Sequence, residues 1–279
     1  MSRAIELISG GCSFTFGNEL SDDDGKRPSR KTWAHRLAQN LKFDYFCTAK
    51  GGYGNQAIAR KVFEYVTTKK PKNKDAFVCV MWSFLSRYDW AFPRHAVLED
   101  TRWASVSPWD TAARRKEVLD RISGSEPVVR DFKRRQADYR EAGVGQFADS
   151  LYRYAANQYH EAYLSWKSIV WLQNLLEKKN IPYMFTLADN SLFWDKKTQL
   201  CDTDPLLKAL HKEIDFNNWY FFGQLQMGFN QWATLNNYPR ATTHPLDTAH
   251  EDALHLMCGK AKTTIDKWRD KNKKEQKND

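Results

Sequence analysis

A serine among small residues is the side chain in this sequence best placed to do chemistry. Ser13 follows the apolar run at residues 5–8 and stands within GGCSFTFG at residues 10–17. Small residues let the backbone turn sharply, and a turn at the carboxyl end of a strand lies where open α/β sheets bind ligands. The pattern predicts an exposed hydroxyl for nucleophilic catalysis; the simpler alternative is a serine that caps a helix.

Two histidines near the C-terminal end are candidates for the base that such a serine needs. His244 is followed by Pro245, and His250 stands three residues after Asp247. A base must come within about 3 Å of the hydroxyl, and a third group must orient its ring. We expect His244 as the base and His250 as the alternative, oriented by Asp189, Asp247 or a backbone carbonyl. The structural alternative for both histidines is bracing of the last helix.

Strand and helix patterns alternate along most of the chain, which predicts a parallel sheet with right-handed crossovers. Short apolar runs predict strands at residues 3–8, 43–47, 76–82 and 182–187, and a fifth strand or a buried turn at 218–222. Apolar residues at helical spacing predict helices at residues 32–41, 56–68 and 204–215, and a long one from 146 or 148 to 178. The loops after the first three strands should therefore converge at one sheet edge.

Residues 89–147 break this alternation with prolines, tryptophans and dense basic runs. We interpret them as a mostly helical basic insertion or cap within a single α/β domain of residues 1–260, followed by a charged, flexible tail at 261–279. The insertion is either a lid over the active face or a structural flap. Its tryptophans, Trp90, Trp103 and Trp109, suit stacking on sugars, although such side chains also build cores.

Composition limits the class of protein and its partners. The 279 residues are 42% hydrophobic, with 11 tryptophans and a formal net charge of +9, which predicts a globular protein with a large core. Residues 77–85 form the longest apolar stretch, so we expect no membrane span, and no signal peptide is visible. Five scattered cysteines without a C-x-x-C pair indicate the cytoplasm or another reducing compartment.

The sequence contains few motifs that would bind a metal ion or a cofactor. No H-x-x-x-H spacing and no phosphate-binding glycine motif is present, so we expect neither a metal nor a cofactor. The positive charge would suit nucleic acid, an anionic glycan or a membrane surface, but much of the excess lies in the C-terminal tail.

Three sequence blocks, taken in order, resemble those of the SGNH (GDSL-type) hydrolases, including the variants common in phage and bacterial genomes. The blocks are GCSFTFG at residues 11–17, GGYGNQAI at 51–58 and HPLDTAH at 244–250. The resemblance implies a three-layer flavodoxin-like α/β fold with a central parallel sheet of about five strands. It also implies esterase or lipase activity through an acyl-enzyme, and leaves the insertion unexplained.

The resemblance assigns an oxyanion hole residue by residue. Ser13 is the nucleophile, and its N–H and the N–H of Gly52 are two of the donors to the oxyanion. The family's Gly-x-Asn, which supplies the last donor, is replaced here by Met81-Trp82-Ser83. The last donor is therefore expected from Ser83 or from Asn55, whose alternative role is to cap a helix.

The histidine block departs from the family as well, because Ala241 stands where an aspartate usually orients the catalytic histidine. A histidine six residues further on is often structural in the family. We expect a serine hydrolase that deacylates a small acyl ester or an acylated glycan. The alternative is a catalytically weak or inactive SGNH-like module that binds a glycan, a nucleic acid or a partner protein.

Overall fold

A four-stranded parallel sheet forms the centre of the computed structural model, which describes residues 4–70, 74–93, 102–114, 117, 126–196 and 198–278. The strands lie in the order β2-β1-β3-β6, and all three pairings are parallel. Their bounds are β1 Ile5–Gly10, β2 Asp44–Cys47, β3 Asp75–Trp82 and β6 Tyr183–Leu187. The four strands expected from apolar runs are thus the four strands of the sheet, residue 3 lying outside the described part.

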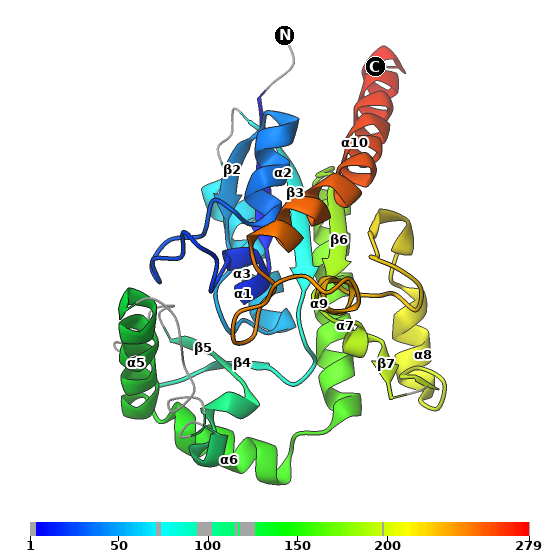
Figure 1. The fold of residues 1–279 in the computed structure, drawn as a ribbon. Coiled ribbons are helices and arrows are strands. Elements are labelled where there is room, and N and C mark those ends of the chain that lie inside the picture. Colours follow the sequence, from blue (N-terminus) through cyan, green and yellow to red (C-terminus); the bar gives the residue numbers. More distant parts are fainter. Residues whose placement is uncertain are drawn as a thin grey trace.

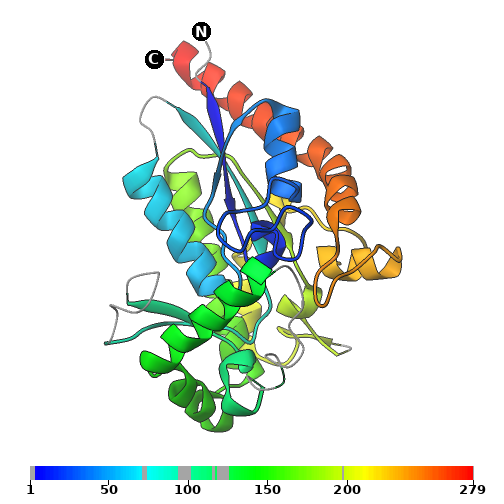
Figure 2. The ribbon, with the colours of Figure 1, turned by 60° about the vertical axis from the view of Figure 1, so that its left-hand side comes forward.

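Helices cover both faces of the sheet, which gives the three-layer α/β architecture expected (Figure 2). One layer pairs α2 with α10, and the other pairs α3 with α7 (Figure 1). The helices are α1 Ser13–Phe16, α2 Trp33–Leu41, α3 Asn55–Glu64, α5 Glu126–Glu141, α6 Val144–Tyr154, α7 Gln158–Lys178, α8 Pro205–Lys212, α9 Phe229–Leu235 and α10 Asp247–Asn278. The core between the layers is apolar and rich in aromatic residues.

Two expected elements differ in the structure. The single helix expected to end at residue 178 is divided into α6 and α7, because the side chain of Asn157 accepts a hydrogen bond from the N–H of His160 and starts a new helix there. Residues 218–222 form no fifth strand. They contribute one parallel bridge between Trp219 and Phe185, where the Trp219 ring packs edge-on against the Phe185 ring.

The insertion contains strands as well as helices. An antiparallel hairpin of β4 (Tyr88–Ala91) and β5 (Trp103–Val106) precedes α5 and α6 and shares a small apolar core with them. The hairpin is attached to the sheet domain by a 2.7 Å hydrogen bond from Gly54 N–H to Ser105 Oγ. Residues 94–101, 115–116 and 118–125, which carry part of the expected basic run, lie outside the described residues.

Residues 261–278, expected as a charged tail, are the last part of a helix. Helix α10 continues from Asp247 to Asn278, because Ala261 and Ile265 are buried along one of its faces and Trp268 Nε1–H donates to the carbonyl of Asn180. Among the described residues, no helix is both long and apolar enough to cross a bilayer.

Candidate active site

The carboxyl ends of the strands bring the expected loops together. Ser9 of β1 pairs with Cys47 of β2, and Gly10 pairs with Val80 of β3. The loop after β2 then contacts the loop after β1, since Lys50 N–H donates to the carbonyl of Gly11. The Ser13 turn and the glycine-rich loop at residues 51–54 are therefore neighbours at one edge of the sheet.

Ser13 is the first residue of the short helix α1, directly after strand β1 and the Gly11 turn. Its side chain is largely enclosed, with 8% of the residue exposed. The N–H groups of Thr15 and Phe16 donate to the carbonyl of Cys12, so the backbone donors that the first turn presents next to the hydroxyl are those of Ser13 and Phe14. A Cβ atom at Gly11 would lie 2.1 Å from Thr15 Oγ1, so the turn requires glycine there. Gly17, at a φ of 92°, ends the helix.

His244 reaches Ser13 from the segment that precedes α10. Its Nε2 lies 2.7 Å from Ser13 Oγ, although the two residues are separated by most of the chain. The imidazole ring packs edge-on against the ring of Phe14, 4.7 Å between centroids. Of the two histidines considered from the sequence, His244 is the one that the structure brings to the serine.

The carboxylate beside His244 comes from Glu19, a residue that the sequence patterns did not single out. Its Oε2 lies 2.7 Å from His244 Nδ1 and also accepts from the N–H and the hydroxyl of Thr243, each at 3.0 Å. Glu19 stands in the loop after α1 in a left-handed conformation, with φ at 68°. The acid therefore follows the serine closely in sequence, instead of preceding the histidine.

The electrostatics of Glu19 determine which nitrogen of His244 carries the proton. Burial alone would raise the pKa of Glu19, but its hydrogen bond to His244, the histidine charge and the two bonds from Thr243 outweigh burial and lower the pKa to about 2. An ionised carboxylate only accepts hydrogen bonds, so the proton of a neutral His244 lies on Nδ1. This leaves Nε2 as the acceptor for the Ser13 hydroxyl.

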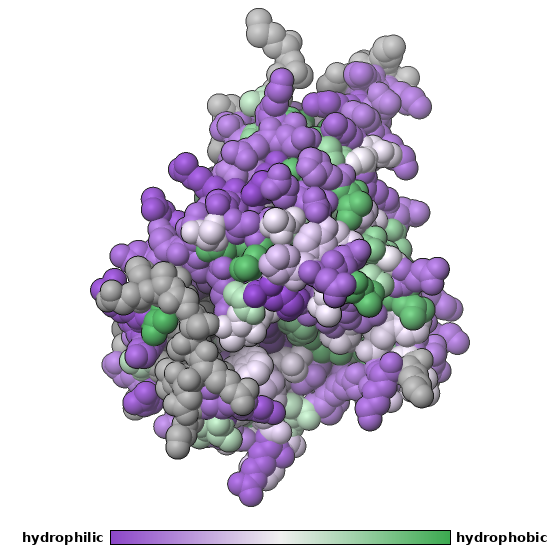
Figure 3. Space-filling model, in the orientation of Figure 1, coloured by the Kyte–Doolittle hydropathy of each residue, from purple (hydrophilic) through white to green (hydrophobic). Residues whose placement is uncertain are grey.

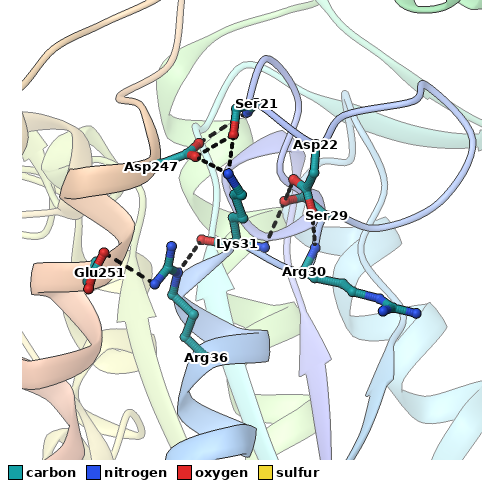
Figure 4. Close-up of polar contacts among 8 residues, drawn as sticks. All are labelled: Ser21, Asp22, Ser29, Arg30, Lys31, Arg36, Asp247 and Glu251. Atoms are coloured by element: carbon teal, nitrogen blue, oxygen red, sulfur yellow. Dashed lines mark hydrogen bonds and ion pairs between the residues drawn. The ribbon is translucent and has the colours of Figure 1, made fainter.

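The two aspartates expected to orient the base contact other groups. Asp247 accepts from Ser21 N–H at 3.1 Å and from Lys31 Nζ at 2.9 Å (Figure 4). Asp189 caps a short turn by accepting from Ser191 N–H. Asp247 is the first residue of α10 and faces the loop after α1, so its position three residues before His250 does not create a catalytic pair.

His250 packs inside the protein. It is buried between α10 and α2, where its Nδ1 accepts a hydrogen bond from the backbone N–H of Trp33 at 3.2 Å. Its ring also packs on Phe229. Burial first, and then the charges of His244 and Arg36, lower its pKa to about 3.

This burial predicts an acid sensitivity of the fold. The pKa of His250 rises from about 3 to its ordinary value of 6.5 on unfolding, so its contribution to stability is complete above pH 6.5 and is lost as the pH falls toward 3. We expect His250→Asn, which keeps an acceptor for Trp33 N–H but does not titrate, to flatten the loss of unfolding free energy between pH 6.5 and 4 by about 3 kcal/mol. Urea titrations at several pH values measure this; equal slopes for both proteins would contradict it.

The residues expected to supply the last oxyanion donor are used inside the protein. Asn55 Oδ1 accepts from Ser83 N–H at 2.7 Å, and its Nδ2 donates to Ser83 O at 3.2 Å and to Ser165 Oγ at 3.0 Å. The buried hydroxyl of Ser83 accepts from Arg87. Both residues hold the loop after β3 in place. Gly52, in contrast, adopts a left-handed φ of 87° in the loop beside Ser13.

Asn55 should therefore matter for folding first. Asn55→Ala leaves the N–H and carbonyl of Ser83 buried without these partners, and we expect it to lower the unfolding free energy by about 3 kcal/mol. Chemical denaturation measures the effect, and Asn40→Ala on the exposed face of α2 is the control. If Asn55→Ala were as stable as the unmodified protein but inactive, the Asn55 side-chain amide would instead be a donor to the oxyanion.

The chain matches no family model, and no curated protein matches it in sequence. Among solved structures, it is similar to a lipolytic protein of the G-D-S-L family from Veillonella parvula, at 12% identity and a TM-score of 0.41 over 92% of this chain and 96% of that one. A carbohydrate esterase family 2 enzyme with a carbohydrate binding domain from Corynascus thermopiles is 11% identical, with a TM-score of 0.45 over 95% and 67% of the two chains.

A further similar structure is the phospholipase A1 of Streptomyces albidoflavus, at 7% identity and a TM-score of 0.40 over 94% of this chain and 100% of that one. Likenesses of this degree do not indicate what the present chain acts on. Its own sheet order and layers agree with the fold that the SGNH resemblance implies. Within the described residues, no cluster of three or more His, Cys, Asp or Glu side chains is arranged to hold a metal ion.

Proposed function

We propose that this protein is a serine hydrolase that cleaves an ester through an acyl-enzyme on Ser13. One observation carries the proposal: Ser13 Oγ, the two ring nitrogens of His244 and Glu19 Oε2 form a continuous line of hydrogen bonds, with 2.7 Å at each of the two junctions. A nucleophile, a base and an ionised orienting group in this order are the requirements for activating a serine hydroxyl.

The first step of the proposed reaction is acyl transfer to the enzyme. Ser13 Oγ attacks the ester carbonyl while its proton passes to His244 Nε2, and Glu19 stabilises the imidazolium that forms. When the tetrahedral intermediate collapses, the bond to the alcohol breaks and His244 returns the proton to the leaving oxygen. The alcohol departs and the acyl group stays on Ser13.

The second step returns the free enzyme. Water gives a proton to His244 Nε2 and attacks the acyl carbonyl, and the acid product leaves as the proton returns to Ser13 Oγ. In both steps the N–H groups of Ser13 and Gly52 are the proposed donors to the oxyanion. Because Asn55 and Ser83 are engaged in the loop after β3, we propose an oxyanion hole built from backbone donors.

The proposed substrates are small acyl esters or O-acylated glycans. Figure 3 shows a recess near the centre of the face that carries α1, bordered by side chains of mixed hydropathy. In the insertion, Trp90, Trp103 and Trp109 are 49%, 36% and 48% exposed, and exposed indole rings are suited to stacking on sugars. The rings already have partners: the Arg60 and Arg114 guanidinium groups lie over Trp103 and Trp109, and Phe147 packs against Trp90, so a sugar would stack on the faces that stay exposed.

Hydrolysis of a panel of esters tests the proposal. p-Nitrophenyl esters from acetate to octanoate measure acyl length, and acetate release from acetylated xylan measures glycan deacylation. The proposal requires turnover of at least the short esters by the purified protein. Equal rates with Ser13→Ala would contradict it, because the hydrolysis would then come from another group or a contaminant.

A non-catalytic binding module is the second candidate, and one observation favours it: the side-chain amide of Asn55 is committed to the loop after β3. Such a module would bind a glycan with a measurable Kd and release no acid from its acylated form. Calorimetric titration with acetylated and deacetylated xylan oligomers, alongside the acetate assay, separates the two functions.

A further inference from the structure

The loop between α1 and α2 delivers Glu19 to His244, so its conformation decides whether the site is complete. The loop has no regular secondary structure from Gly17 to the cap of α2 at Thr32, and Glu19 itself adopts a left-handed backbone that is unfavourable for a residue with a side chain. Contacts from the rest of the fold must therefore stabilise it. One internal contact is the hydrogen bond from Glu19 N–H to Asp23 Oδ2 at 2.8 Å.

A second set of contacts fastens this loop to α10. Asp247 accepts from both the N–H and the hydroxyl of Ser21, two residues after Glu19, at 3.1 and 2.5 Å. Lys31, at the far end of the loop, donates to Asp247 Oδ2 at 2.9 Å and to Ser21 Oγ at 2.5 Å, as Figure 4 shows. One carboxylate thus ties both ends of the loop to the first residue of α10.

Asp247 also stands three residues after His244, so it connects the Glu19 loop to the segment that carries the base. Thr243 and His244 hold the Glu19 carboxylate directly, and Asp247 holds the backbone that presents it. The contacts of Glu19 and those of Ser21 therefore both join the loop after α1 to the segment from Thr243 to Asp247. A shift of Ser21 away from Asp247 would move Glu19 relative to His244, and displacements of about 1 Å in such sites can cost about 100-fold in rate.

We propose that Asp247, together with Lys31 and through Ser21, is a positioning residue that holds Glu19 against His244. The inference rests on the proposed function. The ion pair is half-open to solvent, with side-chain exposures of 25% for Asp247 and 42% for Lys31, and pairs of this kind contribute little to global stability. Its contribution is the local order of the loop.

Kinetic measurements in the unmodified protein and in the Glu19→Gln variant test this role. We expect Asp247→Ala to lower kcat about tenfold with little change in KM, and Lys31→Met to act in the same direction. The fall in kcat caused by Asp247→Ala should disappear when Glu19→Gln is already present, because Asp247 acts through Glu19. Asp247→Asn, which keeps an acceptor for Ser21 N–H and loses the charge facing Lys31, should recover part of the rate.

Glu251→Gln is the matched control. Glu251 lies one turn further along α10 and pairs with Arg36 of α2 at 3.3 Å, so it also ties α10 to its neighbour; Arg36 Nε donates to the Lys31 carbonyl at 3.0 Å, at the end of the loop distant in sequence from Glu19. It should leave kcat unchanged. A fall in kcat for Asp247→Ala that is equally large in the Glu19→Gln background, or no fall at all, overturns the positioning role.

A spectroscopic readout separates this inference from the proposed function. The Nδ1 proton of His244, hydrogen-bonded to Glu19, should give a low-field proton resonance that disappears in Glu19→Gln, weakens or broadens in Asp247→Ala and persists in Glu251→Gln. If the protein hydrolyses no ester, the proposed function fails while this resonance still tests the positioning of Glu19. An unchanged resonance in Asp247→Ala overturns the inference, whatever the activity.

Discussion

Replacing Ser13 by alanine is expected to lower kcat for ester hydrolysis by about 10⁶-fold, and replacing His244 by alanine to have nearly the same effect. The two residues share one proton at 2.7 Å, so neither works without the other. The double variant should therefore be no slower than either single one. Initial rates on the preferred ester of the panel, at saturating substrate, measure all three.

The control for this prediction is Ser150→Ala, which removes an exposed hydroxyl from α6 and should leave the rate unchanged. Thermal unfolding of each variant must be cooperative, so that lost activity is not lost structure. If the fold-losses in kcat of the two single variants multiplied in the double variant, Ser13 and His244 would act independently, which would contradict the proposed mechanism.

Replacing Glu19 by glutamine has the second largest expected effect, a fall in kcat of about 10³- to 10⁴-fold with a small change in KM. The amide has the same size as the carboxylate but cannot stabilise the imidazolium. Its NH₂ group can also donate to His244 Nδ1, which moves the imidazole proton to Nε2, where it prevents acceptance from Ser13. A rate within threefold of the unmodified protein, by the assay of the first prediction, would remove Glu19 from the mechanism.

The same variant has a pH signature. The pKa of Glu19 is about 2 in the folded protein and 4.5 ordinarily, so its stabilising contribution is complete above pH 4.5 and is lost as the pH falls toward 2. Glu19→Gln should therefore show a flatter dependence of unfolding free energy on pH within that window. His250 titrates in the same acid range, so the comparison is made between variants at each pH.

The sheet and the serine could be predicted because their signals are local. Four apolar runs mark the four strands, and Gly11, two residues before Ser13, is required by the close approach of Thr15. Glu19 carries no such signal. Its approach to His244 depends on a left-handed backbone and on contacts of its loop with α10, which join residues more than 200 positions apart.

The spacing of the last block does not by itself show which groups its side chains contact. Asp247 and His250 have the expected separation for a catalytic pair, but both lie in the first turn of α10 and face other groups: His250 faces the start of α2, and Asp247 faces the Glu19 loop. The segment before the helix carries His244, the proposed base. Ala241, in place of an aspartate, is consistent with an acid supplied from elsewhere in the chain.

The remaining differences have local and tertiary causes. A single cap at Asn157 divides the long helix, and contacts with Trp268 extend α10 through a stretch whose composition alone suggested a flexible tail. The hairpin in the insertion has strands of only four residues each, and its pairing is supported by packing against α6. Short strands of this kind give little periodic signal.

The most direct test of the central claim is the site and rate of modification by a fluorophosphonate, read by mass spectrometry of the intact and digested protein. We expect one adduct, on the peptide that contains Ser13, its absence in Ser13→Ala, and much slower formation in His244→Ala and Glu19→Gln. Folded protein that forms no adduct, an adduct on a different serine, or equal labelling rates with and without Glu19 would contradict it.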